Sequence, residues 1–423
     1  MADRLVIPVS LVAQAIESLR AWRTRTLTLT VGRRDTAHGR IWLAQSLGVG
    51  GPERGFRGFD VVSARARPPL TSRDPFENLH PIVGRLSVGD GPSRGRLWGD
   101  VFDFGVAGPL ADITVVGPGM HRIDGASGID PESSADPEGD RWSRTAAALG
   151  GPRAWRRLSR LTAAVIGVGR TGSVMADLLY RLGLSLVLVD ADVVEPHNLA
   201  ESALLGDADV GLPKAMAVAA RLQSVVSDTG STIECVQGRI QDPAAIELVR
   251  QADLVVSSVD NDAARLLAGT IACAHLALLI DVGTGIFLDE RRGQAAFPER
   301  RMGADVRLVL PGDGCILCRG GLTDFQGAVE QLTWRSEPSA SGDTTQARKR
   351  AGSLRSLNEM AAALAVRLLE DLVTRRVDRS VWAHVAFAED GAASVSYPLA
   401  GESVAGPRSC RLCARAGFGE QAL

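Results

Sequence analysis

The middle of the chain alternates short apolar segments with segments of helical periodicity. Apolar strands are expected at five places: Thr162–Ile166, Leu186–Val189, Ile233–Val236, Leu254–Val259 and Leu278–Val282. Helical patterns separate them, at Gly172–Leu182, Lys214–Val225, Pro243–Arg250 and Asn261–His275. Strands that are apolar throughout and joined by helices are typical of a parallel sheet covered on both faces. The sequence therefore predicts an α/β fold with a Rossmann-like, doubly wound, mostly parallel sheet.

The residues before this unit predict a separate N-terminal α+β domain over 1–123. Strand patterns occur at Leu5–Pro8, Thr26–Thr30, Ile41–Leu43 and Ile113–Val116. Ser10 is expected to cap a helix. Leu11, Ala15, Leu19 and Trp22 share one face of that helix. An acidic, turn-rich stretch follows, so we expect a linker over 124–152.

The second domain is expected over 153–423. A basic helix at Ala154–Arg160 should open it, and an irregular, mobile polar segment is expected over 321–352. An amphipathic helix, Leu354–Val373, then leads to a hairpin formed by Val381–Phe387 and Ala393–Tyr397.

Composition excludes several classes of protein. The chain has 423 residues, of which 45% are hydrophobic and 23% charged, values that are typical of a soluble globular enzyme. A net charge of −2 predicts no nucleic-acid-binding surface. The longest uncharged apolar stretch, Leu266–Ile280, is shorter than the ~20 residues of a membrane-spanning helix. The N-terminus shows no signal-peptide pattern, so we expect a cytoplasmic protein whose six cysteines stay reduced.

A G-x-G-x-x-G motif formed by Gly167, Gly169 and Gly172 follows the expected strand Thr162–Ile166 and opens a helix. Glycines here permit a tight turn and close approach of the backbone to a phosphate, while helix N–H groups point at the anion. The next strand ends in Asp190, where a carboxylate can bind a ribose hydroxyl. The motif predicts a nucleotide site, and a nicotinamide-dependent dehydrogenase is one interpretation of it.

Further polar residues occur at positions that a dehydrogenase does not need. Asp192 and Asn198 follow Asp190, a Gly-x-Pro-Lys sequence ends in Lys214, and a later strand ends in Asp260 and Asn261. With this pattern, the stretch of about 157–397 resembles the ThiF-type adenylyltransferases of the ubiquitin-activating-enzyme-like group (HesA, MoeB and ThiF), here of bacterial type with an extra N-terminal domain.

The resemblance implies an enzyme that uses ATP to adenylate the C-terminal carboxylate of a ubiquitin-like protein, releasing pyrophosphate. It implies catalytic roles for Lys214 and Asp260, with Lys214 neutralising phosphate charge and Asp260 binding Mg²⁺. The nucleotide-binding residues would be Gly167, Gly169, Gly172, Asp190, Asp192, Asn198, Lys214 and Asn261. The pathway is expected to be bacterial ubiquitin-like conjugation, with sulfur-carrier activation in cofactor biosynthesis as the alternative.

One departure from the family pattern leaves a third possibility, a catalytically impaired nucleotide-binding scaffold. Glu201 stands where the family has an arginine that contacts the triphosphate, and a carboxylate there would repel phosphate. We expect another arginine to compensate. Those nearest in sequence are Arg156, Arg157, Arg160 and Arg170, and the resemblance also allows an arginine from a dimer partner. Lysine is otherwise almost absent from the chain, since only Lys214 and Lys349 occur, which makes the ammonium at 214 informative.

Four cysteines form two C-x-x-C pairs, Cys315 with Cys318 and Cys410 with Cys413. Four thiolates suit tetrahedral Zn²⁺, so we expect a structural zinc site that clips the C-terminus onto the domain. The remaining Cys235 and Cys273 are expected to be buried and structural.

Many members of this family pass the activated protein to a cysteine of the segment after the first C-x-x-C pair. That segment has no cysteine here, but it contains five hydroxyl side chains: Ser336, Ser339, Ser341, Thr344 and Thr345. Either the enzyme stops at the acyl-adenylate, or one of these hydroxyls forms an oxyester with help from a base such as His384. They can also be ordinary solvated loop residues.

The N-terminal region faintly resembles JAB metalloprotease domains, which accompany such enzymes in bacteria. His38, His80 and His121 are isolated, so no zinc-binding His-x-His motif occurs and no peptidase activity is expected. The region would then be a degenerate JAB-like domain, or a domain that binds the partner or forms the dimer. A homodimer is expected, with a ubiquitin-like protein and a conjugating enzyme as further partners.

Overall fold

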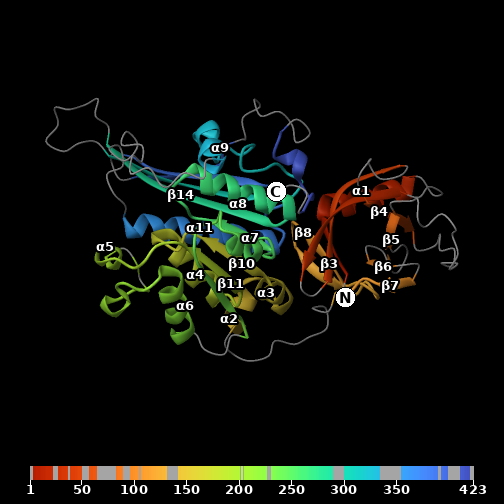
Figure 1. Ribbon diagram of the computed structural model, residues 1–423, viewed down its shortest axis with the longest axis horizontal. Helices are drawn as coiled ribbons and strands as arrows, with labels where there is room; N and C mark the ends of the chain where they lie inside the picture. The colour runs from red at the N-terminus through yellow and green to blue at the C-terminus, as the bar shows by residue number, and fades with distance from the viewer. Residues whose placement is uncertain are drawn as a thin grey trace.

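The computed structural model describes residues 3–21, 27–36, 39–49, 57–63, 82–88, 96–103, 106–130, 142–200, 202, 204–225, 230–288, 300–333, 354–388, 392–398 and 410–419. Two sheets form its framework, one built from the first third of the chain and one from the rest (Figure 1). The expected α/β fold with an additional N-terminal α+β part is confirmed. The exact division into domains stays a prediction.

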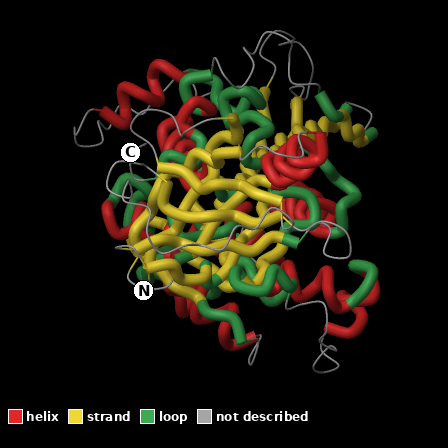
Figure 2. Tube along the Cα trace, turned by 90° about the vertical axis from the view of Figure 1, so that its right-hand side faces the viewer, coloured by secondary structure: helices red, strands yellow, loops and turns green. Residues whose placement is uncertain are grey.

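The N-terminal sheet has nine strands in the order β7-β6-β5-β4-β2-β3-β1-β8-β9. Their bounds are β1 Arg4–Pro8, β2 Leu27–Thr36, β3 Gly39–Val49, β4 Arg57–Ser63, β5 Ile82–Val88, β6 Leu97–Asp103, β7 Val106–Pro109, β8 Asp112–Val116 and β9 His121–Asp124. Figure 2 views the molecule from the side of this sheet and shows its strands running next to one another.

One helix, α1 (Val9–Ala21), packs on the N-terminal sheet. It begins directly after β1, so the expected cap at Ser10 is wrong, because Ser10 already lies within the helix. Val12 and Ala15 bury one side of α1 against core residues of the sheet such as Trp42 and Phe59. Trp22, predicted on the same face, lies outside the described residues.

The second sheet has eight strands in the order β12-β11-β10-β13-β14-β15-β16-β17. Their bounds are β10 Thr162–Ile166, β11 Ser185–Asp190, β12 Ile233–Gln237, β13 Leu254–Ser257, β14 Leu278–Leu288, β15 Arg300–Val309, β16 Val381–Phe387 and β17 Ala393–Ser396. All neighbours from β12 to β14 are parallel, and those from β14 to β17 are antiparallel. The predicted parallel strands and the closing hairpin are confirmed.

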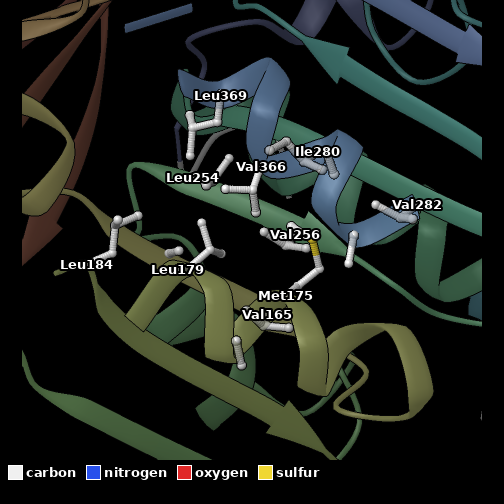
Figure 3. Close-up of a cluster of buried hydrophobic side chains, with 14 of the residues drawn as sticks. Val165, Met175, Leu179, Leu184, Leu254, Val256, Ile280, Val282, Val366 and Leu369 are labelled. Atoms are coloured by element: carbon white, nitrogen blue, oxygen red, sulfur yellow. The ribbon is translucent and has the colours of Figure 1, made fainter. Parts of the chain in front are cut away.

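Helices cover both faces of this sheet, as its apolar strands require. On one face lie α3 (Pro152–Ser159), α4 (Arg170–Arg181), α6 (Lys214–Val225) and α11 (Arg355–Val373). On the other face lie α7 (Pro243–Val249) and α8 (Asp262–His275), with α9 (Phe325–Thr333) against α8. Figure 3 shows the first of these cores, where Met175 and Leu179 of α4 meet Val366 of α11 over Val165 and Val256 of the sheet.

Helices also occur where the sequence predicted none. Helix α2 (Ser143–Ala148) lies within the stretch that we expected to be a linker. Helix α9 begins at Phe325, so the irregular segment expected over 321–352 contains a helix in its first part. None of the helices in the described ranges combines the length and apolar character that crossing a bilayer requires.

The described C-terminal segment, residues 410–419, joins the two sheets. Backbone N–H groups of Gly417 and Gly419 donate to carbonyl groups at the end of α8, at 3.2 and 2.9 Å. Gly419 also forms a parallel β-bridge with Arg33 of β2. A Cβ on Gly32 would lie 2.0 Å from the Gly417 oxygen, so this close approach requires glycine.

Candidate functional site

The glycine turn lies between β10 and α4, at the carboxyl edge of the parallel strands. Gly167 has φ +80°, a left-handed conformation that favours glycine. A Cβ on Gly172 would lie 1.8 Å from the Gly167 oxygen, whereas a Cβ on Gly169 would meet nothing within 4 Å. The Ser258 hydroxyl, after β13, donates to the Gly167 oxygen at 2.6 Å. The turn is thus tightly packed underneath and open above Gly169.

Asp190 lies beside this turn because β10 and β11 are paired in register, with Ile166 opposite Val189. Its Oδ2 accepts a hydrogen bond from the Val168 N–H at 2.6 Å, and its Oδ1 accepts one from the Asp192 N–H at 2.9 Å. Burial raises the pKa of this carboxyl above its ordinary value. The carboxylate is therefore held against the glycine turn.

Lys214 begins helix α6 and lies close to Asp192. Its Nζ is 2.8 Å from Asp192 Oδ2, and its backbone N–H donates to the Asp192 oxygen at 2.9 Å. The Lys214 side chain is only 12% exposed, whereas that of Asp192 is 69% exposed. Lys214 is therefore held in place along its length, with an exposed carboxylate as its only ion-pair partner among the described residues.

The side chains of Asn198 and Asn261 each accept a hydrogen bond from a backbone N–H group, and Asp260 lies next to Asn261. Asn198 lies in the short helix α5 (Pro196–Leu199), and its Oδ1 accepts from the Glu195 N–H at 2.9 Å. Asn261 caps α8 by accepting from the Ala264 N–H at 2.8 Å, and its amide donates to Asp260 Oδ1 at 3.3 Å. Asp260 itself is exposed in the loop between β13, which ends at Ser257, and α8. An exposed carboxylate at this edge fits the oxygen ligands that Mg²⁺ prefers.

The structure thus places the predicted residues on the ends of neighbouring strands and on the starts of the helices that follow. β10 lies between β11 and β13, so the glycine turn, Asp190 and Asp260 share one edge of the sheet. In open α/β sheets, ligands bind in the crevice at this edge. The individual roles of these residues stay predictions.

One group at this edge was missed from the sequence. Arg265 of α8 donates to the Val259 oxygen at 3.1 Å and pairs at 2.8 Å with Asp281, which is 0% exposed. Arg307 of β15 pairs with the other oxygen of Asp281 at 3.2 Å. These two arginines compensate a buried charge and fix the end of β13. In a chain so rich in arginine, no sequence signal distinguished them.

The structure also separates the four arginines proposed to replace the one missing at Glu201. Arg156, Arg157 and Arg160 lie on or just after α3, at the amino end of β10, which is the opposite edge from the glycine turn. Arg157 pairs with Asp130 at 2.8 Å. None of these three therefore lies at the edge of the glycine turn in its own subunit, and which arginine compensates for Glu201, including one from a dimer partner, stays a prediction. Arg170, the first residue of α4, is the one at the correct edge. Glu201 lies outside the described residues.

The four predicted zinc ligands come together. The sulfur atoms of Cys315, Cys318, Cys410 and Cys413 all lie within 4.8 Å of one another, with three pairs at 3.5–3.7 Å. Zn–S bonds of about 2.3 Å in a tetrahedron separate sulfurs by about 3.8 Å, so the cluster fits Zn²⁺. A hydrogen bond from Cys413 lowers the pKa of Cys315, whereas burial and the nearby Cys315 raise the pKa of Cys318.

The other two cysteines are poor nucleophiles. Burial raises the pKa of both Cys235 and Cys273. Their sulfurs lie 3.5 and 3.4 Å from the backbone oxygens of Ala215 and Leu412. The hydroxyl residues considered for an oxyester, Ser336, Ser339, Ser341, Thr344 and Thr345, lie outside the described residues. His384 is on β16, with Nδ1 3.0 Å from Asp305 Oδ1.

Comparison with known proteins gives one family match and several relatives. A model described as the ThiF family matches residues 142–380. Sulfur carrier protein ThiS adenylyltransferase of Bacillus subtilis is 35% identical over 128 residues, covering 29% of this chain and 37% of that protein. SAMP-activating enzyme E1 of Haloferax volcanii is 34% identical, covering 29% and 44%. Ubiquitin-like modifier-activating enzyme 5 of Aedes aegypti is 29% identical, covering 43% and 45%.

The chain therefore spans less than half the length of these relatives. Among solved structures, it is similar to E. coli MccB in complex with MccA-N7isoASN, at 18% identity and a TM-score of 0.48. That match covers 65% of this chain and 75% of the other.

Proposed function

This chain belongs to the ThiF family, and from that membership we propose that it is an adenylyltransferase that uses ATP to activate the C-terminal carboxylate of a small protein. The family match alone does not give this chain an activity or a substrate, because the relatives align over less than half of their own length. Both are therefore part of the proposal. The substrate we favour is a ubiquitin-like protein of a bacterial conjugation pathway.

The observation that carries this proposal is the meeting of one lysine and several carboxylates around a glycine turn. Asp190 is held against the turn by two backbone N–H groups, which suits a ribose. Lys214 is one of only two lysines in the chain and is nearly buried at the start of α6. A dehydrogenase has no use for an ammonium and an exposed Asp260 at this edge, whereas a triphosphate with its metal does.

In the reaction, a carboxylate oxygen of the substrate protein attacks the α-phosphorus of ATP. A new P–O bond forms to give the acyl-adenylate, and the bond to the β-phosphate oxygen breaks to release pyrophosphate. An anion attacking a polyanion gains most from positioning and charge neutralisation. Lys214 would offset charge on the phosphates, and it would exchange its contact with Asp192 for one with the nucleotide. Asp260 would hold Mg²⁺, which supplies further positive charge.

The names of the relatives support two kinds of substrate. Two are named for acting on a sulfur carrier protein or a SAMP, and one for a ubiquitin-like modifier. Residues 321–352 contain no cysteine, which favours an enzyme that stops at the acyl-adenylate and hands it to a sulfur donor or another protein. Sulfur-carrier activation is therefore the second candidate. A homodimer, a conjugating enzyme and a cytoplasmic location remain part of the proposal.

The test is exchange of labelled pyrophosphate into ATP in the presence of a small protein with a free C-terminal Gly. Exchange should require both the protein and its carboxylate, so the same protein with an amidated C-terminus is the matched control. Exchange that is equal with the amidated protein would contradict the proposal. Binding of ATP with no exchange for any candidate protein would instead favour the impaired scaffold that Glu201 suggests.

A further inference from the structure

A cavity of about 410 Å³ lies between the N-terminal sheet and the α/β unit. Its lining comes from α1, β8 and β9 on one side, and from α3 and the turn after α11 on the other. Because α3 precedes β10, this cavity lies toward the amino end of β10, away from the glycine turn at its carboxyl end. Its size is within the range of small-molecule sites.

Charge in this cavity is strongly unbalanced. Four guanidinium groups line it, on Arg96, Arg153, Arg157 and Arg375, and the one carboxylate in its lining is Asp130. Arg153 and Arg157 both donate to Asp130 Oδ2, at 2.9 and 2.8 Å, and that side chain is only 8% exposed. Arg96 and Arg375 have no ion-pair partner within the described ranges. The cavity therefore carries a surplus of positive charge.

Arg157, in the wall of the cavity, also has a buried donor without a partner. Arg157 uses one terminal nitrogen for Asp130 and the other for the Gly119 oxygen, at 3.3 Å. Its Nε is buried and has no hydrogen-bond partner among the described residues. His121 lies beside it, with Nδ1 3.0 Å from the same Gly119 oxygen. Burial and the charge of Arg157 lower the pKa of His121, so this imidazole is uncharged at neutral pH.

Arg375 is held over the cavity in a strained conformation. Its φ of +62° is left-handed, which non-glycine residues rarely adopt. Its side chain crosses Gly119, where a Cβ would lie 2.2 Å from the Arg375 Nε. Strained residues of this kind cluster at binding sites, where the surrounding structure holds them in place.

We propose that this cavity binds a small molecule that carries an oxyanion, either phosphate or carboxylate, on an apolar body. Guanidinium groups form forked, charge-assisted hydrogen bonds to such oxyanions. The apolar part would contact Val9, Val115 and Ile123, which line the same space. The site is separate from the nucleotide site. A molecule bound there would contact residues of both the N-terminal sheet and the α/β unit.

The test is calorimetric titration of the full chain with phenyl phosphate, benzoate and inorganic phosphate, each with and without saturating ATP. Phenyl phosphate should bind more tightly than inorganic phosphate and should still bind when ATP is present. Comparison with benzoate distinguishes a phosphate site from a carboxylate site.

Two variants then localise the binding. Arg375→Gly removes a guanidinium and also relieves the left-handed strain, so it should weaken the better aryl anion by about 10-fold while leaving the melting temperature unchanged or higher. Arg96→Gln should weaken it similarly. The control is Arg376→Gln, which changes an exposed neighbour that does not line the cavity.

Three results would overturn the proposal. They are loss of aryl-anion binding when ATP is added, equal binding by Arg375→Gly and Arg376→Gln, and no binding at millimolar concentration. Pyrophosphate exchange does not enter this experiment, so its outcome is independent of the proposed function.

Discussion

Two neighbouring glycines of the turn should respond differently to the same added methyl group. In Gly172→Ala the new Cβ would lie 1.8 Å from the Gly167 oxygen and 2.6 Å from the Ser258 hydroxyl. Both contacts are far too short, so the turn or the start of α4 must move. Overpacking of this kind costs about 1–3 kcal/mol, and loss of the hydrogen bond from Ser258 to Gly167 adds about 1 kcal/mol.

A destabilisation of about 2–4 kcal/mol in a unit of this size lowers the melting temperature by about 4–7 °C. Gly169→Ala has no such contact within 4 Å, and its φ of −77° suits an L-residue, while its ψ of −147° lies just beyond the extended region and adds a small cost. Its stability should stay within about 1 kcal/mol of the wild type. The methyl group would nevertheless occupy the open side of the turn, so ATP binding should weaken in both variants.

Thermal unfolding followed by circular dichroism, together with ATP titration, measures both effects. The expected pattern is loss of stability and ATP binding in Gly172→Ala but loss of ATP binding alone in Gly169→Ala. Equal melting temperatures for the two variants would show that the packing beneath the turn is not as described. Unchanged ATP binding in Gly169→Ala would show that the open side of the turn does not face the nucleotide.

Three further predictions concern other parts of the chain. Lys214→Ala should reduce pyrophosphate exchange by about 100-fold or more, with Lys214→Arg only partly active; equal exchange by all three proteins would refute a role in charge neutralisation. Cys413→Ser should lower zinc content and the melting temperature, whereas Cys235→Ser should change neither, as measured by a colorimetric zinc assay and thermal unfolding; an unchanged zinc content would disprove the site. Burial, followed by the charges of Arg34 and Arg250, lowers the pKa of His275 to about 3. In the unfolded chain this histidine takes up a proton below about pH 6.5, whereas in the folded protein it stays neutral until the pH approaches 3. The free energy of unfolding is therefore highest above pH 6.5 and falls as the pH is lowered towards 3. Between pH 6.5 and 4.5 this loss amounts to about 2–3 kcal/mol in urea unfolding, and it should vanish in His275→Leu but persist in the exposed control His197→Gln.

The parallel half of the α/β sheet could be predicted from sequence because its strands are buried on both faces. Thr162–Ile166 and Lys214–Val225 form elements with the predicted bounds, since a continuous apolar run and an amphipathic run are distinct patterns. Strand β15 was not predicted, because Arg300–Val309 contains three arginines and an aspartate. Arg307 is 5% exposed there, and its charge is compensated by Asp281 from a neighbouring strand.

The N-terminal sheet was only partly predicted for a related reason. Its strands β4 to β7 contain glycine, arginine and aspartate, and their burial depends on partners that are distant in the chain. Strands β1 and β8, which have short apolar sequences, were found near their observed bounds. Pairing of β1 with both β3 and β8 involves contacts that no local pattern records.

For the site, the sequence identified which residues meet but not how they are held. Strand order alone brings Asp190 and Asp260 to one edge with the glycine turn. The ion pair of Lys214 with Asp192 depends on the path of residues 193–213, where Val193 bridges to Pro213. The Arg265–Asp281 pair lies beneath the same edge and had no sequence signal, because its members are ordinary residues within a helix and a strand.

The central claim is that the carboxyl edge of this sheet binds ATP with its metal rather than a redox dinucleotide. Calorimetric titration of the full chain with ATP in the presence of Mg²⁺, and separately with NAD and NADH, tests it most directly. We predict saturable ATP binding that weakens on removal of Mg²⁺ and in Asp260→Asn, with no binding of NAD or NADH at the same concentrations. Binding of NADH more tightly than ATP, or ATP binding that is indifferent to both Mg²⁺ and Asp260, would contradict it.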